Sequence, residues 1–283
     1  MPAIVWPNNA NLALSLVVNV EEGAEARVDE GDKRPEQVDE LGIALKAPIR
    51  NYGNESNYAY GIKAGGPRVM RLLKQYGMRA TFTAAAQALE RAPGLAREIV
   101  AQRHEVCSHG YKWVHQFGMH KREEETFIRR AVESIERTCG VRPYGWLSRY
   151  LLTASTRDLL IAQGFTYHMD DYSDDLPFWN DPEKRDIVIM PYALDSNDMK
   201  MWTDPAMTPA NWLDYAIDTF DWLYREGQNG EPKMMSFGVH LRIVGRPGRI
   251  GYFEKFLQHV AATPGVWVAT RKEIADHFTK VTA

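Results

Sequence analysis

The sequence predicts an α/β protein with a distorted (β/α) barrel of about seven to eight parallel strands. Short β-branched runs alternate with longer amphipathic runs along the 283-residue chain, which is the pattern of parallel βα units. Several of the strand-like runs end in acids or histidines, as strands do at the mouth of a barrel. No Gly-rich dinucleotide turn follows the first strand, so a doubly wound open sheet is the second choice.

The first half of the chain begins with a predicted strand at 12–20, LALSLVVNV, because this short apolar run is rich in β-branched residues. A polar, loop-like region follows to about Gly66. Apolar residues at helical spacing then predict helices at 68–77, 95–103 and 124–140, and the first and last of these end at glycine. Strands are predicted between them at 79–86 and 105–109.

The second half continues the alternation. Helices are predicted at 155–164, 209–227 and 250–262, and Pro209 suits the first turn of the long one. Strands are predicted at 144–147, 165–169, 186–192, 233–240 and 266–270. We therefore expect about eight strands and six or seven helices in a single catalytic domain, residues 1–283.

Charge and composition exclude several classes of protein. The 34 basic and 37 acidic residues give a formal net charge of −3, so no broad basic field attracts nucleic acid or anionic lipid. The apolar run at 12–20 is too short to span a bilayer, and the N-terminus lacks a basic signal-peptide region. Two cysteines, Cys107 and Cys139, are too few for a disulfide framework. We expect a cytoplasmic protein whose partner is a small molecule, with no nucleic acid and no membrane.

Polar side chains follow most of the predicted strands. Because strand ends of a parallel barrel meet at one face, these side chains predict a catalytic mouth: Asn19, Glu21, Glu22, Ser108, His109, Trp146, Ser148, Arg149, Asp170, Asp171, His240 and Arg242. Each also has a simpler interpretation. Acids after a strand are often solvated, a lone histidine often lies in a core, and the aspartates suit a turn. Cys107 alternates with His109 on a short strand and is better interpreted as a core thiol than as a nucleophile.

The stretch SHGYKW, residues 108–113, has the spacing of a metal site without its second ligand. Histidines at i and i+4 commonly bind one metal ion from one helical turn. Here Trp113 stands four residues after His109, and an indole ring is not a metal ligand. The pattern raises the question of what the tryptophan does there.

Several stretches resemble, in this order, the polysaccharide deacetylase superfamily (carbohydrate esterase family four). More closely, they resemble its metal-independent allantoinase-like branch, which includes cyclic imide hydrolase-like proteins. The resemblance runs from about Leu12 to His277 and rests on VNVEEGAE, ESNYAYGIKAGGPRV, EVCSHGYKWV, GVRPYGW, YSDDLPFW, IMPYALDSNDM, PKMMSFGVHLRIVGRPGR and VWVATRKEIADH.

The resemblance implies roles for particular residues. The deacetylases' pair of aspartates, a base followed by a metal ligand, matches Glu21 and Glu22. Their metal motif matches His109, with Trp113 in the place of the second ligand, and their general acid matches His240. Catalytic zinc takes three protein ligands. We therefore expect no metal and no cofactor, with zinc or another divalent metal on Glu22 and His109 as the alternative.

Two segments depart from the allantoinase-like pattern. The chain reads GWLSRYLLTASTR where that branch has Tyr-Thr-Gly-Arg followed by Pro-Asn-Thr-Arg, and His240-Leu241-Arg242 where it has His-Cys-Arg. These segments are expected to line the substrate pocket. The resemblance therefore predicts the type of reaction better than it predicts the substrate.

The leading hypothesis is a hydrolase that cleaves a C–N bond of a small cyclic amide, ureide or imide, with allantoin as the first candidate. Glu21 or Glu22 activates a water as general base. His109 and His240 polarise the carbonyl and protonate the leaving nitrogen. Predicted substrate-binding residues are Trp113, Trp146, Arg149, Asp171 and Arg242, with the two arginines on an oxyanion, carbonyl or carboxylate.

Two other hypotheses remain open. One is a metal-dependent deacetylase of an N-acetylated sugar or small amide. The other is a non-catalytic barrel that binds a small ligand on Trp113, Trp146 and Trp179. The resemblance also implies a homo-oligomer, a dimer or tetramer, in which an exposed aromatic such as Trp202 makes contacts.

Overall fold

The computed structural model describes residues 4–282, so the predicted domain extends past it at both ends. Over these residues one sheet contains nine strands, in the order β6-β7-β5-β4-β3-β2-β1-β8, with β9 paired to β1. The strands are β1 Leu12–Val20, β2 Thr81–Ala84, β3 Glu105–Ser108, β4 Gly145–Trp146, β5 Tyr167–His168, β6 Phe178–Trp179, β7 Val188–Ile189, β8 Lys233–His240 and β9 Val266–Val268. Eight of them run parallel and only β6 is antiparallel to its neighbour, which confirms the predicted fold class.

The long strand β1 organises the sheet. It pairs with β8 along almost its whole length, with β2 in its C-terminal half and with β9 in its N-terminal half. This register sets Asn19 beside both Thr83 and His240. The polar ends of three strands are therefore side by side.

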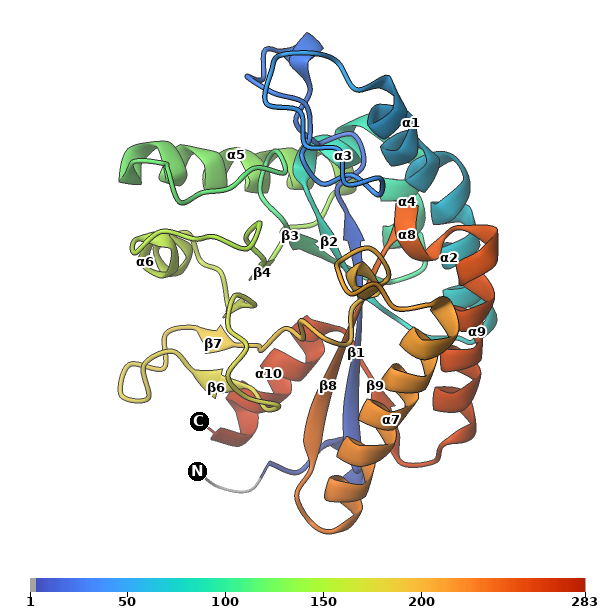
Figure 1. Ribbon diagram of the computed structural model, residues 1–283. Coiled ribbons are helices and arrows are strands. Elements are labelled where there is room, and N and C mark those ends of the chain that lie inside the picture. The colour runs from blue at the N-terminus through green and yellow to red at the C-terminus, as the bar shows by residue number, and fades with distance from the viewer. Residues whose placement is uncertain (1–3, 283) are drawn as a thin grey trace.

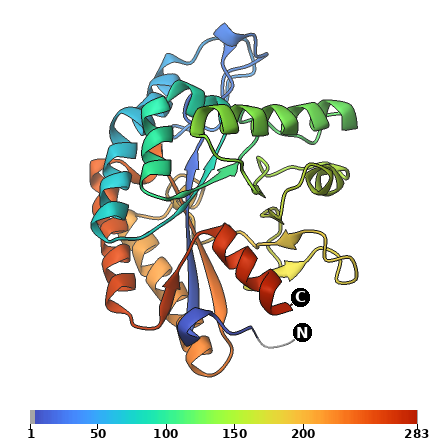
Figure 2. The ribbon, with the colours of Figure 1, turned by 180° about the vertical axis from the view of Figure 1, so that it is seen from behind.

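Helices cover the outer side of the sheet. Figures 1 and 2 show α2, α7 and α9 stacked along one side of the β1–β8 pair, with β4, β6 and β7 on the other side. The helices are α1 Tyr52–Tyr60, α2 Gly66–Gln75, α3 Ala86–Arg91, α4 Pro93–Ala101, α5 Lys121–Cys139, α6 Thr156–Ala162, α7 Pro209–Gln228, α8 Leu241–Val244, α9 Pro247–Ala262 and α10 Arg271–Thr282. Shorter turns are η1 Pro7–Asn9, η2 Val28–Glu30, the π-helical η3 Gly61–Gly65 and η4 Asp198–Met201.

Several elements differ from the prediction. The region predicted as a loop to Gly66 contains α1 and η3, and α3, α8, α10 and β6 were not predicted. Helix α1 buries only Asn54 and Tyr58, so it has little apolar periodicity for sequence analysis to detect. Three predicted strands shrink to two residues each, in β4, β5 and β7. No helix among residues 4–282 combines the length and apolar character needed to cross a bilayer.

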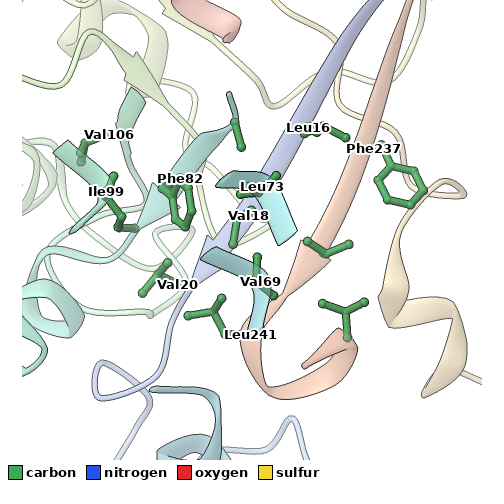
Figure 3. Close-up of a cluster of buried hydrophobic side chains, with 14 of the residues drawn as sticks. Leu16, Val18, Val20, Val69, Leu73, Phe82, Ile99, Val106, Phe237 and Leu241 are labelled. Carbon is green, nitrogen blue, oxygen red and sulfur yellow. The ribbon is translucent and has the colours of Figure 1, made fainter. Parts of the chain in front are cut away.

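Alternation along β1 decides which side chains face the barrel interior. All nine of its residues are buried. Leu16, Val18 and Val20 pack on the helix side with the cluster drawn in Figure 3, whereas Ala13 and Val17 belong to the interior cluster. Because successive side chains of a strand point to opposite faces, the interior row continues through Asn19.

Candidate active site

A cavity of about 500 Å³ opens at the C-terminal ends of the central strands. This volume lies within the range of small-molecule sites, roughly 300–1,000 Å³. Its polar lining includes Asn19, Glu21, His109, Tyr192, Asn197 and His240, and its apolar lining includes Val38, Leu147, Tyr150, Tyr172, Leu194 and Met199. The strand ends thus bring the predicted residues Glu21, His109 and His240 together in one cavity.

Glu21 lies at the base of this cavity, directly after β1. Its Oε1 is 3.4 Å from His240 Nε2 and 3.6 Å from His109 Nε2. Its Oε2 is 2.7 Å from Arg242 Nη1, a close ion pair rather than an aligned hydrogen bond. Burial alone would raise the pKa of Glu21, but Arg242 and His240 together hold it well below the usual range. The carboxylate is therefore ionised at neutral pH.

His240 ends β8 and is held by an acid that the sequence analysis did not identify. Asp198 Oδ1 lies 2.6 Å from His240 Nδ1, and Asp198 Oδ2 accepts the backbone N–H groups of His240 and Val244 at 2.8 and 3.1 Å. Burial lowers the pKa of His240, but the nearby Glu21 and Asp198 carboxylates raise it to about 9. His240 is therefore an imidazolium at neutral pH. The available signal was an acid in LDSNDM, after the predicted strand at 186–192.

The indole of Trp113 is hydrogen-bonded to His109 Nε2, the ring nitrogen that a metal ligand would use. Its indole Nε1–H donates to His109 Nε2 at 3.0 Å, and His109 Nδ1 lies 2.6 Å from the carbonyl oxygen of Leu147. Because an indole nitrogen is only a donor, His109 carries its hydrogen on Nδ1 and is neutral in this arrangement. It offers neither a free lone pair to a metal nor a free N–H to a substrate, in contrast to its predicted role.

The donor set does not match a catalytic zinc site. Such a site needs three protein ligands, and residues 4–282 hold no group of three His, Cys, Asp or Glu side chains placed to bind one ion. The fallback ligands Glu22 and His109 are each engaged elsewhere, Glu22 with backbone N–H groups and His109 with Trp113. No step of a reaction is therefore assigned to a metal here.

Glu22 supports the site from behind rather than lining the cavity. Its side chain is fully buried and accepts the backbone N–H of Glu21 at 3.1 Å and that of Arg242 at 3.0 Å. Burial raises its pKa, Arg242 lowers it and Glu21 raises it, so the net shift is upward. Its place under Gly61, outside the cavity, corrects its prediction as a base.

Arg242 is the counter-ion of Glu21, not a surface group for the substrate. It is the second residue of α8 and is fully buried, and its guanidinium lies 4.2 Å from the centre of the Tyr58 ring. Burial lowers its pKa, but Tyr58, Glu21 and Glu22 raise it above its usual value. The arginine is therefore charged and committed to the two carboxylates.

Arg149 lines the cavity but is already paired. Its guanidinium meets Glu36 in two bonds of 2.9 and 2.5 Å, donates to the carbonyl of Trp113 and lies 3.7 Å from the centre of that indole ring. Glu36 comes from the segment predicted as a polar loop and was not identified from the sequence. The pair fixes this loop over Trp113, which itself lines the cavity as predicted.

The remaining predicted binding residues lie outside the cavity. Trp146 is fully buried, packs edge-on against Phe127 and Phe165, and donates to Ser148 Oγ at 3.0 Å. Asp171 pairs with Arg157 at 3.1 Å and accepts bonds from Ser173. Trp146 is a core residue, and Asp171 belongs to a turn, as the simpler interpretation of the aspartates had it.

Comparisons with known proteins agree with this fold. Residues 57–168 match the family model of polysaccharide deacetylases. A Schizosaccharomyces pombe protein assigned to the polysaccharide deacetylases is 35% identical over 97% of this chain and 92% of its own length. A peptidoglycan deacetylase of Helicobacter pylori is 28% identical, over 84% of this chain and 93% of its own length.

Solved structures extend the likeness to an allantoinase. A Pseudomonas aeruginosa PAO1 protein assigned to the polysaccharide deacetylases has a TM-score of 0.93 and 36% identity, covering 99% of this chain and 95% of its own. PuuE allantoinase also has a TM-score of 0.93 and 36% identity, covering 99% and 94%. These relatives support a hydrolase that acts on carbon–nitrogen bonds. The chain belongs to the polysaccharide deacetylase family, with PuuE allantoinase among its structural neighbours.

Proposed function

We propose that this protein hydrolyses a C–N bond of a small cyclic amide, ureide or imide without a metal, with allantoin as the first candidate. One observation carries the proposal. A carboxylate and an imidazolium, Glu21 and His240, lie 3.4 Å apart at the base of a small-molecule cavity. Each has a buried partner that stabilises its charged form, Arg242 for Glu21 and Asp198 for His240.

The two groups suit general acid–base hydrolysis. Glu21 takes a proton from a water, whose oxygen attacks the substrate carbonyl carbon. His240 then gives the proton on Nε2 to the ring nitrogen as the C–N bond breaks. The partners hold the two pKa values on opposite sides of neutrality, so base and acid coexist. Each positioned group typically contributes about 10²- to 10⁴-fold.

The low pKa of Glu21 favours an activated substrate. A carboxylate whose pKa lies below the usual range is a weak base. A weak base suits an imide or ureide carbonyl, which is more electrophilic than that of an acetamide. The cavity's volume and its partly apolar lining, with Leu147, Tyr172 and Leu194, also suit a compact ring better than a hydrated polymer.

Trp113 supports the metal-free part of the proposal. Its indole N–H occupies the His109 nitrogen that would otherwise face an ion, so we assign His109 the role of holding Trp113 in the cavity wall. The second candidate is a metal-dependent N-deacetylase. The description of the Helicobacter pylori relative as a peptidoglycan deacetylase favours the deacetylation, and the metal is the part that the test below must show. A homo-oligomer remains a prediction, which light scattering of the purified protein checks.

A substrate panel on chelator-treated protein tests the proposal. It contains allantoin, hydantoin, dihydrouracil, succinimide, glutarimide and an N-acetylglucosamine oligomer. We expect opening of at least one ring, reduced about 10²-fold or more in Glu21→Gln and His240→Ala. Glu22→Gln is the matched control and retains more activity than Glu21→Gln, because Glu22 does not line the cavity. Acetate release that requires added zinc, with no ring opened, would favour the deacetylase instead.

A further inference from the structure

The cavity wall contains a tyrosine hydroxyl close to the proposed acid and base. Tyr192 follows β7 and lines the same cavity as Glu21 and His240. Its phenol oxygen accepts a hydrogen bond from Asn19 Nδ2 at 3.0 Å and another from Asn197 Nδ2 at 3.0 Å. Two amide groups from different parts of the chain therefore converge on one phenol oxygen.

The orientation of both amides is determined by their other partners. Asn197 Oδ1 accepts the backbone N–H of Met199 at 2.9 Å, so its NH₂ group is the one facing Tyr192. Asn19 Oδ1 accepts the hydroxyl of Thr83 at 2.6 Å, and its Nδ2 also donates to the carbonyl of Val239 at 3.3 Å. Both amides are thus donors to the phenol, and neither can accept its hydrogen.

The hydroxyl hydrogen of Tyr192 is left as a free donor. A phenol oxygen that accepts two N–H groups has its acceptor sites filled, and no residue among 4–282 accepts the Tyr192 O–H. The side chain is only 7% exposed and borders the cavity. A buried donor without a protein acceptor is costly, and the cavity is where an acceptor from a ligand would arrive.

Gly238 makes room for this hydroxyl. A Cβ atom at Gly238 would lie 2.3 Å from Tyr192 Oη and 2.9 Å from Asn197 Nδ2, closer than atoms can approach. Gly238 is on β8, two residues before His240. The strand that carries the acid of the reaction therefore also admits the tyrosine hydroxyl to the cavity.

We propose that Tyr192 is the oxyanion donor of the hydrolysis, donating its O–H to the carbonyl oxygen on which negative charge develops. The inference rests on the proposed function. Neither arginine predicted for this role is available to the substrate, because Arg149 is paired with Glu36 and Arg242 does not line the cavity. A preorganised hydroxyl donor in the same cavity as the acid and the base can stabilise the oxyanion without either arginine.

The proton balance of the step is complete with this assignment. Water attacks the carbonyl carbon, Glu21 takes its proton, and the carbonyl π electrons move to the oxygen that Tyr192 contacts. The hydrogen stays on Tyr192, because burial raises the pKa of its phenol above the usual value. When the C–N bond breaks, the electrons return from the oxygen and His240 protonates the nitrogen.

Tyr192→Phe tests the assignment on the amide that the wild-type enzyme hydrolyses best. We expect kcat to fall about 10²- to 10³-fold, as for loss of an oxyanion donor, with a smaller change in KM. Tyr167→Phe is the matched control. Tyr167 is fully buried and donates its hydroxyl to Glu105 away from the cavity, so it reports the structural cost of losing a buried tyrosine hydroxyl and should leave kcat within about threefold.

Fluorotyrosines at position 192 separate a catalytic role from a structural one. They keep the hydroxyl and the ring while changing its acidity, so an oxyanion donor gives a graded change of kcat across the series. A flat series, or a folded Tyr192→Phe enzyme with kcat within about threefold of wild type, overturns the assignment of Tyr192 alone. Wild-type protein that hydrolyses no amide in the panel contradicts the proposed function itself, and the assignment with it.

Discussion

The pKa values of the adjacent residues Glu21 and Glu22, just after β1, shift in opposite directions. Glu21 lines the cavity and its pKa is lowered, whereas Glu22 lies behind it and its pKa is raised. Burial raises both pKa values, but Glu21 is closer to Arg242 and also faces His240. The two side chains diverge where the chain leaves β1, so one carboxylate lines the cavity and the other accepts backbone N–H groups.

The pKa of His240 predicts an alkaline limit that depends on Asp198. His240 must be protonated to act as the acid, so we expect kcat/KM to fall above about pH 9. Asp198→Asn removes a charged hydrogen bond worth about 1.5–3 kcal/mol, so the limit should move about one to two pH units lower. The pH–rate profile measures it. Asp195→Asn, an acid three residues away that bonds Tyr215 instead, is the matched control, and an unmoved limit in Asp198→Asn would contradict the assigned acid.

The π-helical turn η3 is the element that closes the back of the site. A Cβ at Gly61 would lie 2.6 Å from Glu22 Oε1, and one at Gly65 would lie 2.0 Å from the carbonyl oxygen of Leu241. The two glycines therefore let the turn lie directly on Glu22 and on the start of α8, which carries Arg242. π-helical turns often occur at functional sites, and here the turn supports the ion cluster.

Gly65→Ala tests this close packing. The obstructing atom is a backbone oxygen that cannot rotate away, so we expect a loss of at least about 1–3 kcal/mol, as in overpacked cores. At about 2–4 °C per kcal/mol for a chain of this size, the thermal midpoint should fall by several degrees. Gly251→Ala in α9 is the control, because open space surrounds that position, and it should be neutral or stabilising by about 0.5–1 kcal/mol. Equal midpoints for the two variants would refute the tight contact.

The whole molecule assembles a buried ion cluster from distant segments. Glu21 follows β1, Asp198 begins η4, His240 ends β8 and Arg242 lies on α8. All four side chains are at most 7% exposed. Buried charges are tolerated when each has a partner, and removing one partner of such a pair typically costs about 3–5 kcal/mol. The cluster therefore couples the pH dependence of stability to the integrity of the site.

The stability of the fold should depend on pH through His240. Its pKa rises on folding from 6.5 to about 9, so its stabilising contribution is complete below pH 6.5 and is lost as pH rises through about 9. This rise in pKa corresponds to a contribution on the order of 3 kcal/mol. Urea unfolding of wild type and of His240→Gln across pH 6 to 10 measures this contribution. Other groups titrate in both proteins, so the difference between the two free energies of unfolding reports His240 alone. A difference between them that stays constant with pH would be inconsistent with the raised pKa.

Glu21 acts at the acidic end of the pH range. Its lowered pKa stabilises the fold above pH 4.5, and that contribution is lost as pH falls.

Local patterns in the sequence determined the main architecture. The β-branched residues of the first run and the apolar residues before His240 predicted β1 and β8 at the residues where they occur, Leu12–Val20 and Lys233–His240, because burial on both faces of a sheet selects apolar residues. The alternation of strands and helices predicted the eight parallel strands. Acids and histidines just past strand ends predicted three cavity residues, Glu21, His109 and His240, since parallel strands end at a common face.

Only the tertiary structure decided what each polar group does. Asp198 and Glu36 lie on a short turn and a loop that carry no periodic signal, and the predicted strand that ends at Tyr192 does not indicate its partner. Their partners His240, Arg149 and Asn19 are 42, 113 and 173 residues away. Likewise, the sequence placed Trp113 four residues after His109, but only the packing shows its indole bonded to the imidazole. Hydrogen bonds and charge shifts act over a few ångströms in space, and separation along the chain does not determine that distance.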